Sequence, residues 1–140
     1  MTIELTDNLA GCHAVRRAVF INEQNVSEAE ELDDLDAQAL HILATKDGTP
    51  VGTARLLIHD AYGKIGRVAV TKDMRGTGLG AKIMQVVLDV LRAQDGVTHA
   101  KLDAQISALK FYEKLGFIAQ GPEFMDANIP HRLMVMPLSS

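Results

Sequence analysis

The 140 residues are 47% hydrophobic, a composition typical of one globular domain with a single core, and we treat residues 1–140 as that domain. A formal net charge of −4 argues against general nucleic-acid binding, and no apolar run approaches the length of a membrane span. The N-terminus lacks the basic-then-apolar order of a signal peptide, and a single cysteine excludes an internal disulfide, so we expect a cytoplasmic location.

The first part of the chain predicts a strand and then a helix. Residues Thr2–Leu5 are strand-like, and Asp7 or Asn8 can cap a helix that runs to about Ile21. The spacing of the side chains divides this helix into a core face and a solvent face. The residues expected to face the core are Leu9, Cys12, Val15, Val19 and Phe20, and those expected to face solvent are Arg16 and Arg17.

An acidic run begins within a capping-box sequence, Ser27–Glu30, which predicts a second, short helix. The acidic residues are Glu28, Glu30, Glu31, Asp33, Asp34 and Asp36. They are typical of a solvated helix and loop, or of an acidic rim that attracts a cationic acceptor. A metal site made of Asp33, Asp36 and His41 is a third interpretation, but nothing in the spacing fixes its geometry, so we predict no metal site.

Three strand-like segments come next, separated by turns. Leu40–Thr45, Val51–Ile58 and Lys64–Val70 are apolar or β-branched in most positions. Lys46–Pro50 contains Asp-Gly, a strong hairpin signal, and Tyr62-Gly63 marks the second turn. The three segments therefore predict a three-stranded meander.

Three glycines in five residues follow the last of these strands, in the stretch Arg75-Gly76-Thr77-Gly78-Leu79-Gly80. Residues 81–94 then carry apolar side chains at helical spacing, so the glycines form a turn from a strand into a helix N-terminus. Four backbone N–H groups at such a terminus lack a helical partner, and the helix dipole adds partial positive charge. Glycine lets a ligand approach closely, and Arg75 can fork onto phosphate oxygens. The stretch therefore predicts a phosphate-binding site.

Several families bind phosphate in this way, and the residues around the glycines separate them. A P-loop needs Gly-Lys-Ser/Thr, whereas Gly80 is followed by Ala-Lys-Ile. Gly76, Gly78 and Ala81 fit a dinucleotide fingerprint, but other residues separate the strand from the motif, and too few follow for that larger sheet. The pattern Arg/Gln-x-x-Gly-x-Gly/Ala, met by Arg75, Gly78 and Gly80, resembles the pyrophosphate loop of the GNAT acyl-CoA N-acyltransferases. A glycine-rich turn without a ligand is the remaining alternative.

The last part of the chain predicts a strand, a helix and two short strands. Ala100–Ala104 has the pattern of a buried strand and Ser107–Leu115 that of a helix, while Phe117–Ala119 and Leu133–Met136 are the final strands. Gly121–His131, which contains two prolines, is expected to be irregular. The resulting order, β-α-α-β-β-β-α-β-α-β-β, predicts an α+β domain with a mixed, largely antiparallel sheet and helices on both faces.

A second motif covers the stretch from Gln105 to Phe117. Ala108, Tyr112, Gly116 and Phe117 match the GNAT C-terminal pattern Asn-x-x-Ala-x-x-x-Tyr-x-x-x-Gly-Phe. Gln105 replaces the Asn that contacts the pantetheine arm in many members of that family. Two independent motifs in the family's order make the resemblance to GNAT enzymes specific.

The resemblance covers nearly the whole chain. Val19–Gln24, the acidic run, His41 and Ile129–His131 are similar to the ElaA/YjcF-like branch of small bacterial GNAT proteins. The resemblance implies a three-layer α/β/α GNAT-type fold and direct transfer of an acetyl group from acetyl-CoA to a primary amine of a small molecule or peptide. A non-catalytic acyl-CoA-binding or regulatory module with the same fold is the alternative. Neither nucleic acid nor a membrane is an expected partner, and a homodimer is one of the oligomeric states left open.

The resemblance also implies roles for individual residues. Tyr112 would protonate the leaving thiolate, whose pKa as a free thiol is ~8.5, and His131 would remove the proton of an acceptor amine with a pKa of ~10.4. Glu23, on the helix that borders the acceptor pocket in the family, is the second candidate for this base. The groups expected to bind acetyl-CoA are the backbone of Val68 and Val70, the loop residues Arg75, Gly76, Thr77, Gly78, Leu79 and Gly80, and the Gln105 side chain.

Overall fold

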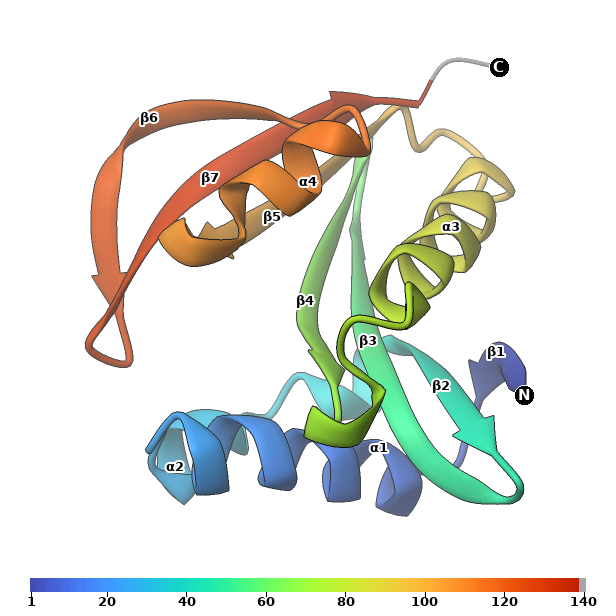
Figure 1. The fold of residues 1–140 in the computed structure, drawn as a ribbon. Coiled ribbons are helices and arrows are strands. Elements are labelled where there is room, and N and C mark those ends of the chain that lie inside the picture. Colours follow the sequence, from blue (N-terminus) through green and yellow to red (C-terminus); the bar gives the residue numbers. More distant parts are fainter. Residues whose placement is uncertain (139–140) are drawn as a thin grey trace.

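The computed structural model describes residues 1–138, which form a seven-stranded mixed sheet with helices on both faces (Figure 1). The strand order is β1-β2-β3-β4-β5-β7-β6, in which β4 and β5 are parallel and every other neighbouring pair is antiparallel. The strands are β1 (Thr2–Thr6), β2 (Leu40–Lys46), β3 (Thr49–His59), β4 (Tyr62–Val70), β5 (His99–Gln105), β6 (Ile118–Asp126) and β7 (Ile129–Pro137). The helical segments are α1 (Leu9–Arg16), η1 (Arg17–Glu23), α2 (Glu28–Glu31), η2 (Asp36–Gln38), η3 (Lys72–Met74), α3 (Leu79–Arg92), η4 (Ile106–Ala108) and α4 (Leu109–Lys114). The predicted α+β class, its three layers and its order of elements are confirmed.

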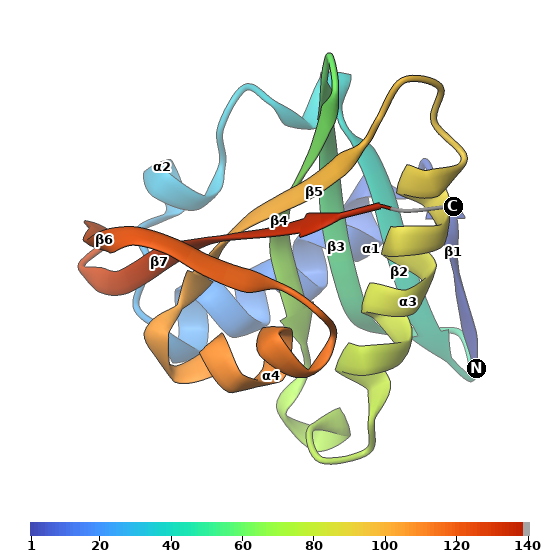
Figure 2. The same ribbon diagram turned by 90° about the horizontal axis from the view of Figure 1, so that it is seen from above.

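The helices pack on opposite faces of the sheet. α1 lies against β2, β3 and β4, whereas α3 covers the other face of these strands (Figure 1 and Figure 2). Ile83, Val87 and Leu91 of α3 are fully buried, at the helical spacing that predicted this helix. On the α1 face, Cys12 and Val15 are buried, as predicted. Among residues 1–138 no helix has the length and apolar character needed to cross a membrane.

The sheet opens between β4 and β5. In the described chain these strands pair at one end, where Tyr62–Ile65 lie opposite His99–Leu102, and then run apart (Figure 1). A β-bulge lies on β4 where the strands diverge: the pairing with β3 shifts register between Thr53 and Arg55, and Arg67 has a left-handed φ of +53°. A bulge bends its strand and increases the local twist. We infer that this bulge turns the end of β4 away from β5 and so opens the gap.

The C-terminal hairpin contradicts one prediction from the sequence. Gly121–His131, predicted to be irregular, lies instead within β6 and β7, and only the pairing between Gln120 and Phe124 shifts register. The two strands meet at the two-residue turn Ala127-Asn128. Both turn residues have left-handed φ, +51° and +63°, as a two-residue hairpin of this kind requires. Pro122 is tolerated because β6 is an edge strand, and Pro130 lies beyond the last pair that β7 shares with β5.

The first helix begins as predicted but ends differently. The Asn8 side chain accepts a 3.0 Å hydrogen bond from the Gly11 N–H and caps α1. After Arg16 the helix widens into the π-helix η1, which carries the chain on to Glu23. Ser27 then caps α2, as the capping-box sequence predicted. π-helical turns are rare and are frequent at functional sites, so Glu23, the last residue of η1, is a candidate for the site.

Candidate active site

A cavity of about 510 Å³ lies in the gap between β4 and β5. Its walls come from the second half of β4, the end of β5, α4, the β6–β7 hairpin and the segment from η1 to α2. The predicted site residues among those that line it are Glu23, Val68, Val70, Arg75, Gln105, Tyr112 and His131. The fold therefore brings together side chains from distant parts of the sequence around one cavity.

The glycine loop runs from η3 into α3. Gly76 and Gly78 have φ angles of +78° and +85°, in the left-handed region. The Thr77 hydroxyl donates a 2.5 Å hydrogen bond to the Met74 carbonyl and closes the turn. Gly78 is the N-cap of α3, and within the described residues no side chain caps this helix. The N–H groups of its first turn therefore remain available to an anion, and the loop reaches the cavity through Arg75.

Arg75 connects the glycine loop to Glu23. Its Nη1 and Nη2 each donate a 2.7 Å hydrogen bond to one oxygen of the Glu23 carboxylate. Its Nε and Nη2 also donate hydrogen bonds of 3.2 Å to the Val70 carbonyl. The hydrogen bonds from Arg75 lower the pKa of Glu23 and raise that of Arg75. This pairing keeps Glu23 ionised but weakens it as a base.

Tyr112 lies on α4 with 9% of its surface exposed. Its ring packs edge-on against Phe111 and Phe117, at centroid distances of 5.0 and 6.0 Å. Burial raises the pKa of the Tyr112 hydroxyl to about 12. The hydroxyl is therefore protonated near neutral pH, which is the form that can donate a proton to a leaving group.

His131 lies on β7, where it pairs with Gln105 of β5, lines the cavity and is 8% exposed. Its Nδ1 is 2.6 Å from the Ile129 carbonyl oxygen. A carbonyl can only accept a hydrogen bond, so Nδ1 carries the proton and Nε2 is the basic nitrogen of the ring. Phe124 of the neighbouring β6 stacks on the imidazole at 5.9 Å and 21°. The hairpin thus fixes both the tautomer and the plane of the ring.

Backbone groups and one amide complete the walls. Past Ile65, the edge of β4 that faces β5 has no strand partner within residues 1–138, and Val68 and Val70 lie on this stretch. An extended ligand can therefore pair with this edge as a neighbouring strand would. At the end of β5, Gln105 donates a 2.9 Å hydrogen bond from Nε2 to Gln24 Oε1, just after η1.

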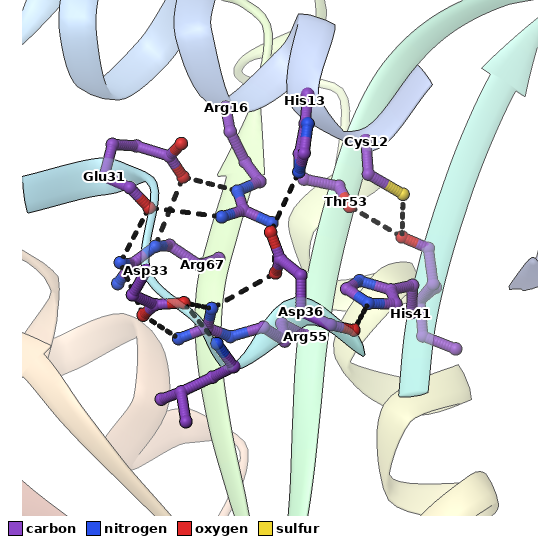
Figure 3. A network of polar contacts seen from close by, with 12 residues as sticks. Cys12, His13, Arg16, Glu31, Asp33, Asp36, His41, Thr53, Arg55 and Arg67 are labelled. Atoms are coloured by element: carbon purple, nitrogen blue, oxygen red, sulfur yellow. Dashed lines mark hydrogen bonds and ion pairs between the residues drawn. The ribbon is translucent and has the colours of Figure 1, made fainter. Parts of the chain in front are cut away.

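An ion network lies between α1 and the sheet (Figure 3), and three of its residues, Glu31, Arg55 and Arg67, also line the cavity. It joins the guanidinium groups of Arg16, Arg55 and Arg67 to the carboxylates of Glu31, Asp33 and Asp36. The prediction that Arg16 lies outside is wrong, because its side chain is 1% exposed and pairs with Glu31 and Asp36. The sequence contained a signal: Arg16 lies four residues after Cys12 and three before Val19, on the same helix face.

The other two arginines hold the acidic run against the sheet. Arg55 donates to Asp33 at 2.7 and 3.0 Å and to Asp36 at 3.2 Å. Arg67, the residue of the β-bulge, donates to Glu31 and Asp33 at 3.2 Å each. Sequence analysis missed both arginines, because strand periodicity does not reveal which charged side chains point to a buried partner.

These contacts show that the acidic run is neither entirely a solvated helix and loop nor entirely an acidic rim, the two interpretations given by the sequence. Its members divide into two groups: Glu28, Glu30 and Asp34 are exposed, while Glu31, Asp33 and Asp36 are paired with arginines. Burial pushes the pKa of Asp36 up, but hydrogen bonds from Arg16 and His13 outweigh burial and leave that pKa well below its usual range. His41 Nε2, in turn, lies 2.9 Å from the Asp36 carbonyl oxygen. The inner part of the run is therefore structural rather than a rim open to solvent.

Comparison with known proteins identifies the family to which the chain is similar. The chain matches the family model of the acetyltransferase (GNAT) domain over residues 6–138. It is 42% identical to the uncharacterized protein YyaT of Bacillus subtilis over 128 residues, which are 89% of this chain and 86% of YyaT. It is 38% identical to the uncharacterized N-acetyltransferase YjcF of the same organism over 130 residues, 92% of each chain. The crystal structure of Escherichia coli ElaA has a TM-score of 0.85 and 27% identity, covering 97% of this chain and 99% of ElaA.

Proposed function

Because the chain belongs to the GNAT acetyltransferase family, in the branch of YjcF and ElaA, we propose that it transfers the acetyl group of acetyl-CoA to a primary amine. The acceptor is a small molecule or a peptide. One observation carries the proposal: Tyr112 and His131 line a single cavity at the β4–β5 gap, which also borders the arginine of the glycine loop. A proton donor, a proton acceptor and an anion site around one cavity are the groups that this reaction needs.

The donor would lie along the gap. Its diphosphate would bind the open N–H groups of Gly78, Leu79 and Gly80 at the start of α3, where the helix dipole favours negative charge. Its pantetheine arm would pair with the free edge of β4 at Val68 and Val70. These assignments follow from the chemistry of the groups: a diphosphate needs N–H donors, and an amide-containing arm needs an unpaired strand edge.

In the proposed reaction the acceptor nitrogen attacks the thioester carbon, a C–N bond forms and the C–S bond breaks. His131 would accept the amine proton at Nε2, directly or through one water molecule. A backbone N–H on the free edge of β4 would stabilise the developing oxyanion, a contribution of about 3–4 kcal/mol where one donor has been removed in other enzymes. Tyr112 would give its proton to the departing sulfur.

The choice of base follows from what each candidate contacts. Glu23 is held in a two-pronged ion pair with Arg75, which lowers its pKa, whereas the backbone contact of His131 involves Nδ1 and leaves Nε2 for the acceptor. We expect His131→Ala to slow acetyl transfer and to abolish the acidic limb of the plot of kcat/KM against pH. Glu23→Gln should keep this acidic limb. The opposite result would reverse the assignment. A limb that survives in both variants would belong to the amine or to another group.

The activity itself is tested by steady-state release of free CoA from acetyl-CoA across polyamines, amino sugars, aminoglycosides and peptides. Mass spectrometry of the product would show a gain of one acetyl group on nitrogen. Binding of acetyl-CoA without CoA release for any amine would favour the alternative, a non-catalytic acyl-CoA-binding module. The cytoplasmic location, the extent of the single domain and the homodimer stay predictions.

A further inference from the structure

We propose that Glu23 and Arg75 form a latch that acyl-CoA opens, so that donor binding releases a carboxylate into the acceptor part of the cavity. This inference rests on the proposed function, because it takes a CoA diphosphate as the ligand of the glycine loop. Both residues line the cavity, and their side chains join the end of η1 to the start of that loop.

Counting the donors of Arg75 shows why the two partners compete. A guanidinium carries five N–H groups. Two of those on Arg75 donate to the Glu23 carboxylate, one from Nη1 and one from Nη2, and two more donate to the Val70 carbonyl, one from Nε and one from Nη2. One N–H of Nη1 is left over. A diphosphate can therefore take a fork of two N–H groups from Arg75 only by displacing Glu23 or the Val70 carbonyl. Glu23 is the partner that holds the fork of Nη1 and Nη2, and its negative charge is the one that a diphosphate would repel.

The exchange is favourable for the diphosphate. The side chains of Arg75 and Glu23 are 45% and 31% exposed, and an exposed ion pair contributes little stability. A diphosphate brings more charge than a carboxylate, and it also gains the N–H groups of the α3 N-terminus. If Glu23 stayed in place, its negative charge would lie beside the diphosphate and repel it.

The released carboxylate has an evident use. Glu23 would face the cavity as an anion without its guanidinium partner, suited to the ammonium form of an arriving amine. Binding of acyl-CoA would then raise the affinity for the amine. Thermodynamic linkage requires that amine binding raise the affinity for acyl-CoA by the same factor. Glu23 would hold the acceptor in position, while His131 would remove its proton.

The test measures binding of CoA alone by calorimetry, so that no acceptor is needed. Glu23→Gln should tighten CoA binding about 2- to 5-fold, because the diphosphate no longer competes with an exposed ion pair for Arg75. Asp73→Asn is the matched control: it removes the same charge two residues from Arg75 and should have a smaller effect. In the Arg75→Ala background, the effect of Glu23→Gln should fall to that of the control.

Two outcomes would overturn the latch. The first is that Glu23→Gln binds CoA with unchanged or weaker affinity. The second is that Glu23→Gln raises the affinity for CoA by the same factor in the wild-type and the Arg75→Ala backgrounds. Thermal unfolding would verify that each variant is folded. If the wild-type protein failed to bind CoA at all, the proposed function would fail first, and the two failures are thus distinguishable.

Discussion

Replacing Arg16 by methionine tests the buried ion network. Arg16 is 1% exposed and contacts Glu31, which is 3% exposed, and Asp36, which lies 2.9 Å from its Nη1. The three arginines and three carboxylates of the network sum to zero formal charge, so the variant leaves one uncompensated negative charge. Breaking a buried pair in this way costs about 3–5 kcal/mol. For a chain of this size that corresponds to a fall in Tm of about 10–15 °C.

The adjacent residue provides the matched control. Arg17 pairs with Glu28 at 3.0 Å, but the two side chains are 51% and 60% exposed, so Arg17→Met should cost less than about 0.5 kcal/mol. Urea denaturation followed by circular dichroism gives both free energies of unfolding. Equal destabilisation by the two substitutions would refute the assignment of a buried network.

The same variant should respond to pH with a defined sign. Hydrogen bonds hold the folded-state pKa of Asp36 below its unfolded value, despite burial, so Asp36 stabilises the fold above pH ~4 and this contribution is lost as pH falls. Without Arg16 the pKa of Asp36 is depressed less, and protonation relieves the uncompensated charge at a higher pH. The stability gap between wild type and Arg16→Met should therefore be full at pH 7 and shrink below about pH 4.

Two further predictions concern the donor and the acid. Gly78→Asp should weaken acetyl-CoA binding about 10- to 100-fold, since it places a negative charge beside the diphosphate at a left-handed φ of +85°. Gly78→Ala separates the backbone strain from the charge, and unchanged affinity of a folded Gly78→Asp would remove the site from this loop. Tyr112→Phe should lower kcat about 10- to 10⁴-fold with little change in acetyl-CoA affinity, because only a hydroxyl is lost. If Tyr112→Phe kept the wild-type kcat on a substrate for which the chemical step limits the rate, Tyr112 would be a packing residue and not the acid.

Local sequence signals predicted most of the fold and the conformation of the glycine loop. Ile83 and Val87 showed the helical period of α3, and Gly76 and Gly78 showed that the turn before it needs left-handed backbone. Such features depend on neighbours within a few residues of one another. The order of elements then allowed one mixed sheet, which is the arrangement observed.

Features that depend on distant partners were the ones that sequence reasoning missed. Arg16 was placed outside because its charge outweighed its position on the apolar face, and its partner Glu31 lies 15 residues away. The segment around Pro122 and Pro130 was expected to be irregular, since a proline donates no backbone hydrogen bond. Both prolines occupy positions that need no such bond, and that fact depends on which strands are neighbours.

The buried charges explain how the segment after Glu23 keeps its position against β4. Arg67, on the bulge of β4, donates to the Glu31 carboxylate and also to the backbone carbonyls of Glu30 and Glu31 at 3.2 and 3.0 Å. Apolar side chains of the same volume could stabilise the fold as well, but they would not impose the direction that hydrogen bonds impose. The network therefore ties the segment after Glu23 to β4 where that strand leaves β5. This connection therefore holds the β4 side of the cavity, while His131, the proposed base, lies on β7 at the β5 side.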